Sequence, residues 1–242
     1  MFLPDTRTLL VVAPFAFAAA WLAGRAAISL RRRGTSPPYT RKVFHFVIFT
    51  FAAVVQFWHG PAGVVTFGAV VASVVLLAVL RGYDSALFDA LARPSDSPRE
   101  RWFVVAPLAS TAVGGVVSNL LFGPFAVVGY LVAGWGDAIA EPVGERWGRH
   151  RYRSPSMFGV RATRSLEGSI AVFTVGAIGA LVALLASSMT LVHAGAAALA
   201  AGFAGALIEA VSTHGLDNLT VQVGASGIAY FVIMVLFNVA MV

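Results

Sequence analysis

The chain has 242 residues, of which 58% are hydrophobic and only 12% are charged. Soluble domains usually carry about 25% charged residues, so this composition excludes an ordinary soluble domain. The sequence contains no cysteine, which excludes disulfides and thiolate metal sites. The net charge of +6 comes from 16 Arg and one Lys against 11 acids. We attribute these basic residues to the flanks of membrane spans and not to nucleic-acid binding.

Eight apolar segments follow one another along the chain. About 20 apolar residues cross the hydrocarbon layer as a helix, because each backbone polar group has to be satisfied within its own segment. The segments run over residues 8–30, 43–58, 61–80, 102–122, 125–141, 168–187, 190–209 and 219–241. The second is short and the fifth ends in acidic residues. We therefore predict an all-α, polytopic transmembrane helix bundle of seven or eight spans, forming one integral membrane domain over residues 1–242.

Basic residues gather in alternate connections between these segments. Residues 31–42, 81–101 and 142–167 hold 15 of the 17 basic side chains, and the connections at 59–60 and 123–124 hold none. Lys and Arg in short loops mark the cytoplasmic side of a membrane protein. The basic connections, including the Arg-rich one at 142–167, are therefore predicted to be cytoplasmic. With eight spans, both termini lie outside, and the cell membrane is the expected location.

A second interpretation of the N-terminus is a cleaved signal peptide over residues 1–23. Arg7 would then be the charged start of that peptide. The run 31–33 consists of three arginines directly after the first apolar segment. Because such a run resists translocation, we favour a retained membrane span.

The segment 134–148 carries two acidic residues where the fifth apolar segment ends. Asp137 and Glu141 are four residues apart, which places both carboxylates on one face of a helix. Carboxylates at membrane depth normally face a cavity or a partner. Two of them on one face can hold Mg²⁺, which prefers oxygen ligands and substrate phosphates. The alternative is an ordinary helix end at the water interface. Glycines that allow close backbone approach are Gly134, Gly136 and Gly144.

The Arg-rich connection ends at the start of the sixth apolar segment with Arg164, Glu167 and Gly168. An Arg fork suits phosphate oxygens, and the free N–H groups of a helix start favour an anion. This pattern indicates a phosphate site at Arg164. For the arginines from Arg146 to Arg153, contact with anionic lipid and a topological role are the favoured explanation. Ser165 and Glu167 also fit helix capping.

Two further clusters contain polar residues in apolar surroundings. Lys42 is the single lysine, and His45 lies three residues later on the same helical face, among bulky apolar residues where an imidazole needs a partner. The alternative for Lys42 is an anchor at the membrane interface. Glu209 ends the seventh apolar segment, and Asp217 with Asn218 opens the eighth. Asp217 also fits a helix N-cap, whereas Glu209 has no such structural explanation.

Taken together, these clusters resemble the dolichol kinase and phytol kinase family, part of a wider group that includes phosphatidate cytidylyltransferases. The resemblance extends from Arg41 to about Gly224. Its most specific part is a D-x-x-A-x-x-x-G motif, formed by Asp137, Ala140 and Gly144. A basic-x-x-Glu-Gly-Ser run follows, formed by Arg164, Glu167, Gly168 and Ser169. The remaining matches are an R-K-x-x-H start (Arg41, Lys42, His45) and a late Glu…Asp-Asn set (Glu209, Asp217, Asn218).

The resemblance implies a CTP-dependent kinase that phosphorylates an isoprenoid alcohol. The two glycine-containing motifs would form the nucleotide site, with Asp137, Ala140, Gly144, Arg164, Glu167 and Gly168. Asp137 and Glu141 would hold Mg²⁺, and Arg164 with Lys42 would stabilise charge on the phosphoryl group. Asp217 or His45 would orient or deprotonate the lipid hydroxyl. Members of the family often carry lysine where this chain has Arg164.

Two other functions are compatible with the sequence. The first is a cytidylyltransferase that makes a CDP-lipid, although the Asp-rich pattern expected near the C-terminus of the phosphatidate enzymes is missing. The second is a lipid transporter or flippase, but transporters place polar residues near the bilayer midplane and often contain inverted repeats. The expected partners are a nucleoside triphosphate, an isoprenoid alcohol and membrane lipids. The alcohol, the base of the nucleotide and the oligomeric state are left open.

Overall fold

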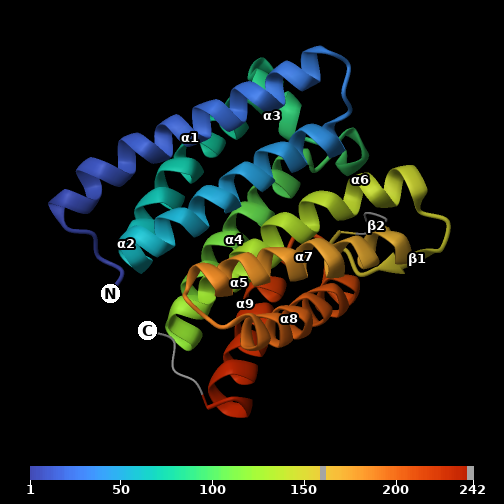
Figure 1. The fold of residues 1–242 in the computed structure, drawn as a ribbon. Coiled ribbons are helices and arrows are strands. Elements are labelled where there is room, and N and C mark those ends of the chain that lie inside the picture. Colours follow the sequence, from blue (N-terminus) through green and yellow to red (C-terminus); the bar gives the residue numbers. More distant parts are fainter. Residues whose placement is uncertain (159–161, 239–242) are drawn as a thin grey trace. The chain divides into compact units, whose positions relative to one another are not determined.

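A computed structural model describes residues 1–158 and 162–238, and its ribbon is almost entirely helical (Figure 1). The predicted all-α bundle is therefore confirmed in outline. The chain divides into two compact units, Met1–Ala112 and Val113–Val242, and the boundary lies inside the helix α4.

The first unit consists of two long helices and a connection made of short helical turns. Its elements are α1 (Thr6–Arg32), α2 (Pro37–Arg81), η1 (Gly82–Asp84), α3 (Ala86–Leu91), η2 (Pro94–Asp96) and the first half of α4 (Glu100–Phe122). The helix α2 is broken at Gly60, whose φ of 59° and ψ of −158° are not helical. A residue with a side chain rarely adopts this φ, so glycine permits the sharp bend. The predicted segments 43–58 and 61–80 are the two arms on either side of it.

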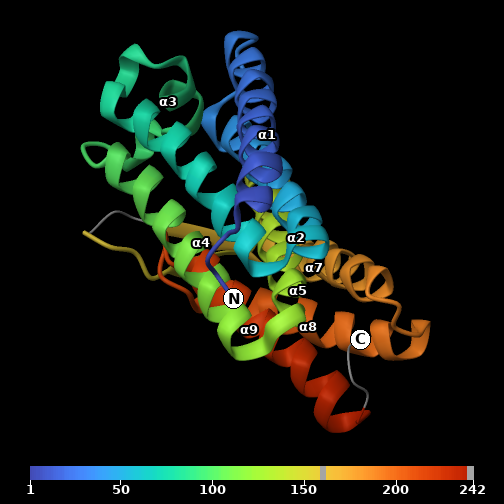
Figure 2. The ribbon, with the colours of Figure 1, turned by 90° about the vertical axis from the view of Figure 1, so that its left-hand side faces the viewer.

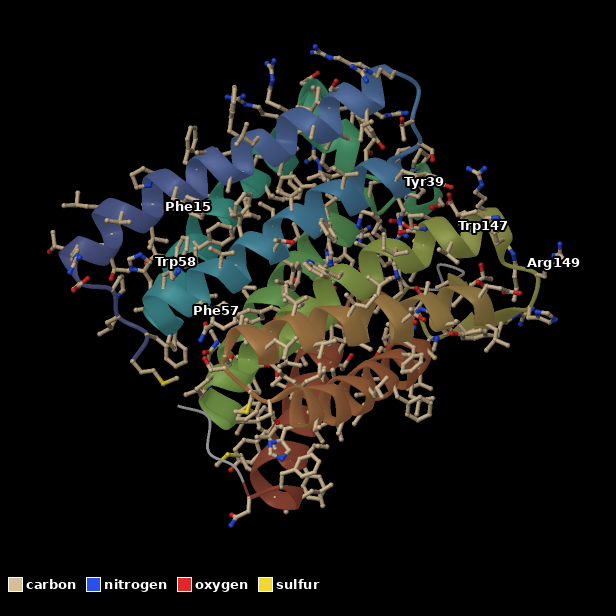
Figure 3. All side chains as sticks on the ribbon, in the orientation of Figure 1. Phe15, Tyr39, Phe57, Trp58, Trp147 and Arg149 are labelled. Atoms are coloured by element: carbon tan, nitrogen blue, oxygen red, sulfur yellow. The ribbon has the colours of Figure 1, made fainter. Side chains whose placement is uncertain are left out.

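Small side chains bring α1 against α2. The buried face of α1 consists mainly of alanine and glycine, which allow two helices in a membrane to approach closely. Phe15, labelled in Figure 3, fills the space between the helices, with its ring 5.3 Å from that of Phe51 in an edge-to-face arrangement. Arg31 near the end of α1 forms an ion pair of 2.9 Å with Asp89 of α3. The end of α1 is thereby fastened to the connection after α2.

The second unit contains the remaining helices and one small sheet. After α4 come η3 (Gly123–Phe125), α5 (Ala126–Leu131), the π-helical turn η4 (Val132–Gly136), α6 (Asp137–Trp147), β1 (Arg151–Ser154), β2 (Ala162–Ser165), α7 (Leu166–Ala186), α8 (Leu191–Val211), α9 (Asp217–Tyr230) and the π-helical turn η5 (Phe231–Leu236). The chain turns at Gly123, whose φ is +55°. The hydrogen bond of 2.5 Å from Asn119 Nδ2 to the Tyr130 hydroxyl then joins α4 to α5.

Close backbone contacts hold α7 between its neighbours. Figure 2 shows α7 and α8 side by side. A Cβ atom added to Gly202 of α8 would lie 2.8 Å from Ala177 of α7. On its other side, α7 lies against α5, because a Cβ added to Gly179 would be 3.0 Å from the side chain of Leu131. Van der Waals packing of small residues is the main attraction between helices in lipid, and this unit uses it throughout.

The Arg-rich connection contains regular structure that the sequence analysis did not predict. The helix α6 continues to Trp147, and β1 and β2 then form an antiparallel hairpin whose register pairs Tyr152 with Arg164. Figure 3 shows the side chains of Trp147 and Arg149 pointing outward at the end of α6. The backbone N–H of His214 donates a 2.9 Å hydrogen bond to the Pro155 carbonyl, which fastens the hairpin to the α8–α9 connection. Arg161 lies outside the described residues.

Within the described residues, six helical stretches are long and apolar enough to cross a membrane. These stretches indicate an integral membrane protein. Two of them, Pro37–Asp84 and Glu100–Trp147, have 48 residues each, and each contains two of the eight predicted segments. The number of helical stretches therefore differs from the predicted number of spans because one helical arm follows directly on another at the bends of Gly60 and Gly123. The last predicted segment, 219–241, extends past the end of the described residues.

Candidate active site

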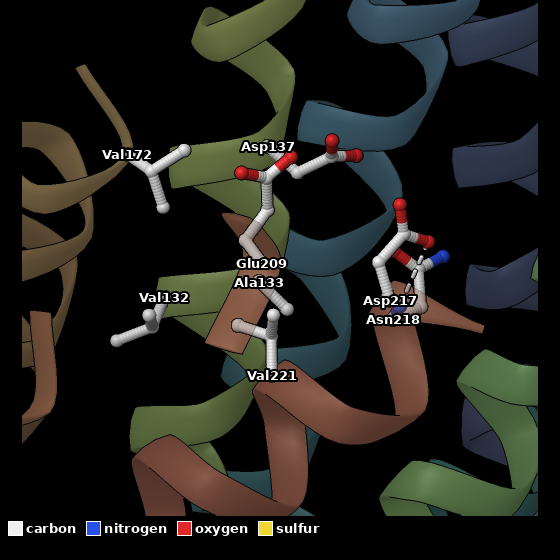
Figure 4. Close-up of a pocket in the computed structure, with 8 residues that line it drawn as sticks. All are labelled: Val132, Ala133, Asp137, Val172, Glu209, Asp217, Asn218 and Val221. Carbon is white, nitrogen blue, oxygen red and sulfur yellow. Dashed lines mark hydrogen bonds between the residues drawn. The ribbon is translucent and has the colours of Figure 1, made fainter. Parts of the chain in front are cut away.

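Three acidic side chains from three helices converge in the second unit. Asp137 is the first residue of α6, Glu209 lies near the end of α8, and Asp217 is the first residue of α9. One carboxylate oxygen of each lies within 4.8 Å of those of the other two, and Figure 4 shows the three groups pointing toward one another. We call these three residues the carboxylate cluster. Glu209 is buried, and the other two are half-buried.

The position of Asp137 depends on the π-helical turn that precedes it. Residues Val132–Gly136 form η4, and α6 begins directly afterward. Turns of this kind interrupt a helix by one extra residue and are frequent at functional sites. A Cβ added to Gly136 would lie 3.1 Å from the side chain of Val172 in α7. A larger residue at 136 would push α7 away from the start of α6, so glycine here keeps Asp137 close to the other two carboxylates.

A short connection brings Glu209 and Asp217 together. The Ser212 hydroxyl, just after α8, is 2.6 Å from the Ile208 carbonyl and also 2.6 Å from the Thr220 hydroxyl in the first turn of α9. These contacts join the end of α8 to the beginning of α9. Asp217 at the first position of a helix is also favoured by the helix dipole. The backbone N–H of Asn218 donates a 3.1 Å hydrogen bond to Asp217 Oδ1, drawn as a dashed line in Figure 4.

Arg164 contacts two members of the carboxylate cluster. Its Nε lies 2.7 Å from Glu209 Oε1, and its Nη2 lies 2.9 Å from Asp217 Oδ2. The register of the hairpin explains why Arg164 reaches them, because residues directly opposite each other share one face. The partner of Arg164, Tyr152, lies on that face, and its hydroxyl is 2.7 Å from the Ser169 hydroxyl of α7. Arg164 and Tyr152 are thus both directed toward the helices.

The charge and chemistry of the carboxylate cluster suit a divalent cation. Mg²⁺ is held in proteins by one or two carboxylates together with water and substrate phosphates. Three carboxylates from three helices, with oxygens within 4.8 Å of one another, provide such oxygen ligands. Asp137, Glu209 and Asp217 therefore fit a magnesium site.

A small pocket adjoins the carboxylate cluster. Besides the three acids and Asn218, the residues that line it are Val132, Ala133, Val172 and Val221 (Figure 4). The pocket encloses about 210 Å³, including space open to solvent. Small-molecule pockets are usually about 300–1,000 Å³, so this space is smaller than one that holds a whole ligand. Its lining is apolar on the side away from the carboxylates.

The glycine-containing motifs pack against each other. A Cβ added to Gly168 would lie 3.0 Å from the Ala140 carbonyl, and one added to Gly144 would lie 3.0 Å from the Ser165 hydroxyl. The Ser165 hydroxyl accepts a 3.1 Å hydrogen bond from the Gly168 N–H, which confirms the predicted cap of this helix. The two motifs thus bring α6 against the start of α7. Contact between Ala140, Gly144 or Gly168 and a nucleotide stays a prediction.

Several other predicted site residues lie apart from the three carboxylates. Glu141 is half-buried one turn further along α6, and the metal-binding group among the described residues contains Glu209 and Asp217 in its place. Glu167 Oε1 is 2.8 Å from His150 Nδ1, a pairing that the sequence analysis did not predict. The roles of Glu141 and Glu167 stay predictions.

Lys42 and His45 belong to the first unit, where both lie on the first arm of α2. Lys42 is buried, with 6% of its surface exposed. The ring of His45 packs at 4.4 Å against that of Phe49, one turn further along the helix. Their proposed roles in catalysis stay predictions.

Comparison with known proteins supports the family resemblance. Over 122 residues, which are 49% of the chain, the sequence is 40% identical to a phytol kinase from Synechocystis sp.. The resemblance to the phytol kinase family is confirmed. The match covers 48% of that relative, so the chain spans about half the length of the phytol kinase it matches. No family model and no solved structure matches the chain.

Proposed function

We propose that this protein is a lipid kinase that transfers the γ-phosphoryl group of CTP to the hydroxyl of an isoprenoid alcohol. The observation that carries the proposal is the meeting of Asp137, Glu209 and Asp217 at one point. All three residues belong to motifs shared with lipid kinases, yet they are as much as 80 positions apart in the sequence. The 40% identity to a phytol kinase supports the same reaction class and the same type of acceptor.

The carboxylate cluster would hold the metal ion of a Mg²⁺–nucleotide complex. Bound Mg²⁺ supplies neutralisation of the charge on the nucleotide phosphates. Phosphoryl transfer requires little covalent chemistry from the protein, so its residues act by positioning and by electrostatic stabilisation. The hydroxyl oxygen of the alcohol attacks the γ-phosphorus, the bond to the β-phosphate oxygen breaks and CDP leaves. The hydroxyl proton passes to a base, for which Asp217 and His45 are the candidates and Asp217 is preferred. In that role Asp217 would leave the metal to Asp137 and Glu209, since Mg²⁺ needs only one or two carboxylates.

The apolar part of the pocket supports an isoprenoid acceptor. In Figure 4, Val172 lies beside Asp137 and Glu209, and Val132 and Val221 lie below them. An alcohol with a polar head and a hydrocarbon tail would place its hydroxyl at the acids and its chain along these valines. The tail would enter sideways, from the lipid between helices.

We further propose eight membrane crossings with the basic connections in the cytoplasm. A straight helix of 48 residues would be about 72 Å long, more than twice the hydrocarbon thickness of about 30 Å. The bends at Gly60 and Gly123 divide each of the two long stretches into arms of suitable length for one crossing. This arrangement places the β1–β2 hairpin and the carboxylate cluster near the cytoplasmic face, where the nucleotide is available.

The proposal is tested by product analysis. The purified protein is incubated with Mg²⁺, each of the nucleoside triphosphates and a panel of isoprenoid alcohols. We expect CDP and a phosphorylated lipid in equal amounts, with CTP as the best donor. Pyrophosphate and a CDP-lipid would identify a cytidylyltransferase. Lipid movement between the leaflets of vesicles without turnover of nucleotide would identify a flippase and overturn the kinase.

A further inference from the structure

Four of the five N–H donors of Arg164 are used by the protein itself. Its Nε and Nη2 contact Glu209 and Asp217, as described above. Its Nη1 donates to the backbone carbonyls of Glu209 and Ser212, the latter at 3.0 Å. The side chain is 12% exposed. All three nitrogens of the guanidinium are therefore used by acceptors at the end of α8 and the start of α9.

These contacts hold the acceptors of Arg164 in a fixed geometry and also bring a positive charge to the two carboxylates. A guanidinium is planar and rigid, so its fork holds each acceptor in a defined direction. Two of the four acceptors are the carboxylates of Glu209 and Asp217, and the other two are the backbone carbonyls of Glu209 and Ser212. Arg164 therefore spans the turn between α8 and α9. Its position controls the separation of the two carboxylates.

The hairpin holds Arg164 from the opposite side. Tyr152, its cross-strand partner, contacts Ser169 of α7, and the Pro155 carbonyl accepts from the His214 N–H of the α8–α9 connection. The hairpin is thus fastened to both elements between which Arg164 lies. A shift of register by one residue would direct Arg164 away from the carboxylates.

We propose that Arg164 is a positioning residue, which sets the spacing of Glu209 and Asp217 for a divalent cation, and that it is not a ligand of the nucleotide phosphates. The inference rests on the proposed function for the identity of the reaction. The positioning role itself, which we call the Arg164 clamp, concerns metal binding alone. It revises the role that the family resemblance implies for Arg164, because four of the five N–H donors of this side chain are committed to the protein and only one, on Nη2, is left for a phosphate.

Lysine at position 164 separates the two roles. A phosphate ligand needs a positive charge, which the compact ammonium group of lysine also supplies. A clamp needs a planar fork that reaches two carboxylates and two carbonyls simultaneously, which a single ammonium group cannot do. If Arg164 binds phosphate, Arg164→Lys preserves function. If Arg164 is a clamp, Arg164→Lys is nearly as damaging as Arg164→Gln.

The experiment measures binding of Mn²⁺ to the full-length protein in detergent, by electron paramagnetic resonance without nucleotide. Mutation of the outer partners of metal ligands typically weakens metal binding about 10–100-fold, and we expect a loss in this range for both Arg164→Lys and Arg164→Gln. At saturating metal, the KM for CTP should change by less than about threefold. The matched control is Arg153→Lys, because Arg153 is exposed in β1 and lies on the other face of the hairpin from Tyr152.

Each outcome has a definite meaning. Unchanged Mn²⁺ affinity in Arg164→Lys, or a raised KM for CTP with normal Mn²⁺ affinity in Arg164→Gln, would overturn the clamp. A wild-type protein that binds no Mn²⁺ would also overturn it. If the wild type binds Mn²⁺ and the variants lose it, but no alcohol is phosphorylated, the clamp stands and the proposed function fails.

A second variant guards against a failure of the Arg164 variants to fold. Tyr152→Phe leaves Arg164 in place and removes only the hydroxyl that joins the hairpin to Ser169. We expect Mn²⁺ affinity to fall about threefold to tenfold, less than for a direct partner of the ligands. Ser169→Ala removes the same contact from the other side and should match it. Normal Mn²⁺ affinity in both variants would show that the hairpin does not position the carboxylates.

Discussion

At the scale of single residues, the carboxylates of the second unit differ in their surroundings. Asp137, Glu209 and Asp217 face one another across three helices, and Glu141 sits one turn along α6 from this group. The sequence analysis paired Asp137 with Glu141 because they are neighbours on one helix. The fold provides nearer partners from α8 and α9, so the contribution of each acid can be separated by mutation.

Asp137→Asn should abolish activity while expression and folding stay near normal. The substitution keeps the size of the side chain and removes a charge that would bind the metal. We expect kcat to fall by at least about 100-fold, the typical cost of removing one electrostatic contact of a transition state. The measurement is CTP-dependent phosphorylation of an isoprenoid alcohol. Full activity in Asp137→Asn would remove the residue from the site.

In its effect on Mn²⁺ binding, Glu209→Gln should be closer to Asp137→Asn than Glu141→Gln is. Glu209 belongs to the carboxylate cluster, so its loss removes a ligand and leaves Arg164 with one carboxylate partner in place of two. We expect a loss of Mn²⁺ binding of about 10–100-fold for Glu209→Gln and a smaller loss for Glu141→Gln. Titration of Mn²⁺ into the three variants compares them directly. Equal losses at positions 141 and 209 would return Glu141 to the metal site as predicted from the sequence.

At the scale of elements, the motif glycines act by letting α6 approach α7. Gly168 lies in the first turn of α7, directly under the carbonyl of Ala140. A methyl group at 168 would stand 3.0 Å from that carbonyl oxygen, which is backbone and cannot move out of the way by itself. The motif positions that resemble lipid kinases therefore have a packing role in this chain, whatever contacts they make with a nucleotide.

Gly168→Ala should destabilise the second unit by about 1–3 kcal/mol, the usual cost of overpacking. The matched control is Gly195→Ala in α8, where an added Cβ meets no atom within 4 Å. The control should be neutral or stabilising by up to about 1 kcal/mol, because alanine is the better helix former. Thermal unfolding of the two variants in the same detergent measures the difference. Equal unfolding temperatures would contradict the close α6–α7 contact.

At the scale of the whole molecule, the proposed topology places all basic connections on one side of the membrane. The chain has no native cysteine, so single cysteines report position without interference. Three single-cysteine variants are compared. Positions 95 (Ser95→Cys) and 153 (Arg153→Cys) lie in connections predicted to be cytoplasmic, and position 59 (His59→Cys) lies beside the bend of α2. An impermeant thiol reagent added to intact cells should label position 59 only. Labelling of position 153 from outside would show that the proposed orientation is wrong. The carboxylate cluster would then lie on the side of the membrane away from cytoplasmic CTP.

Much of the fold could be predicted from the sequence. The starts and ends of α1, α7 and α8 lie within two residues of the predicted segments 8–30, 168–187 and 190–209. Long apolar runs bounded by polar residues have one stable form in a bilayer, which is the helix, because no water satisfies their backbone groups. The hairpin escaped prediction since its strands are four residues each and rich in arginine, without the apolar alternation that indicates a strand.

The sequence by itself determined that this is a helical membrane protein, and its motifs identified the acids and Arg164 as candidates. Only the tertiary structure decided which of these residues meet. Two strands and the helix α7 lie between the helices that carry Asp137 and Glu209, and no local pattern relates these two residues. Their meeting depends on the packing of glycines between α6, α7 and α8 and on the register of one short hairpin. Local periodicity encodes elements, whereas a site made from several elements is defined by the contacts that form when those elements pack.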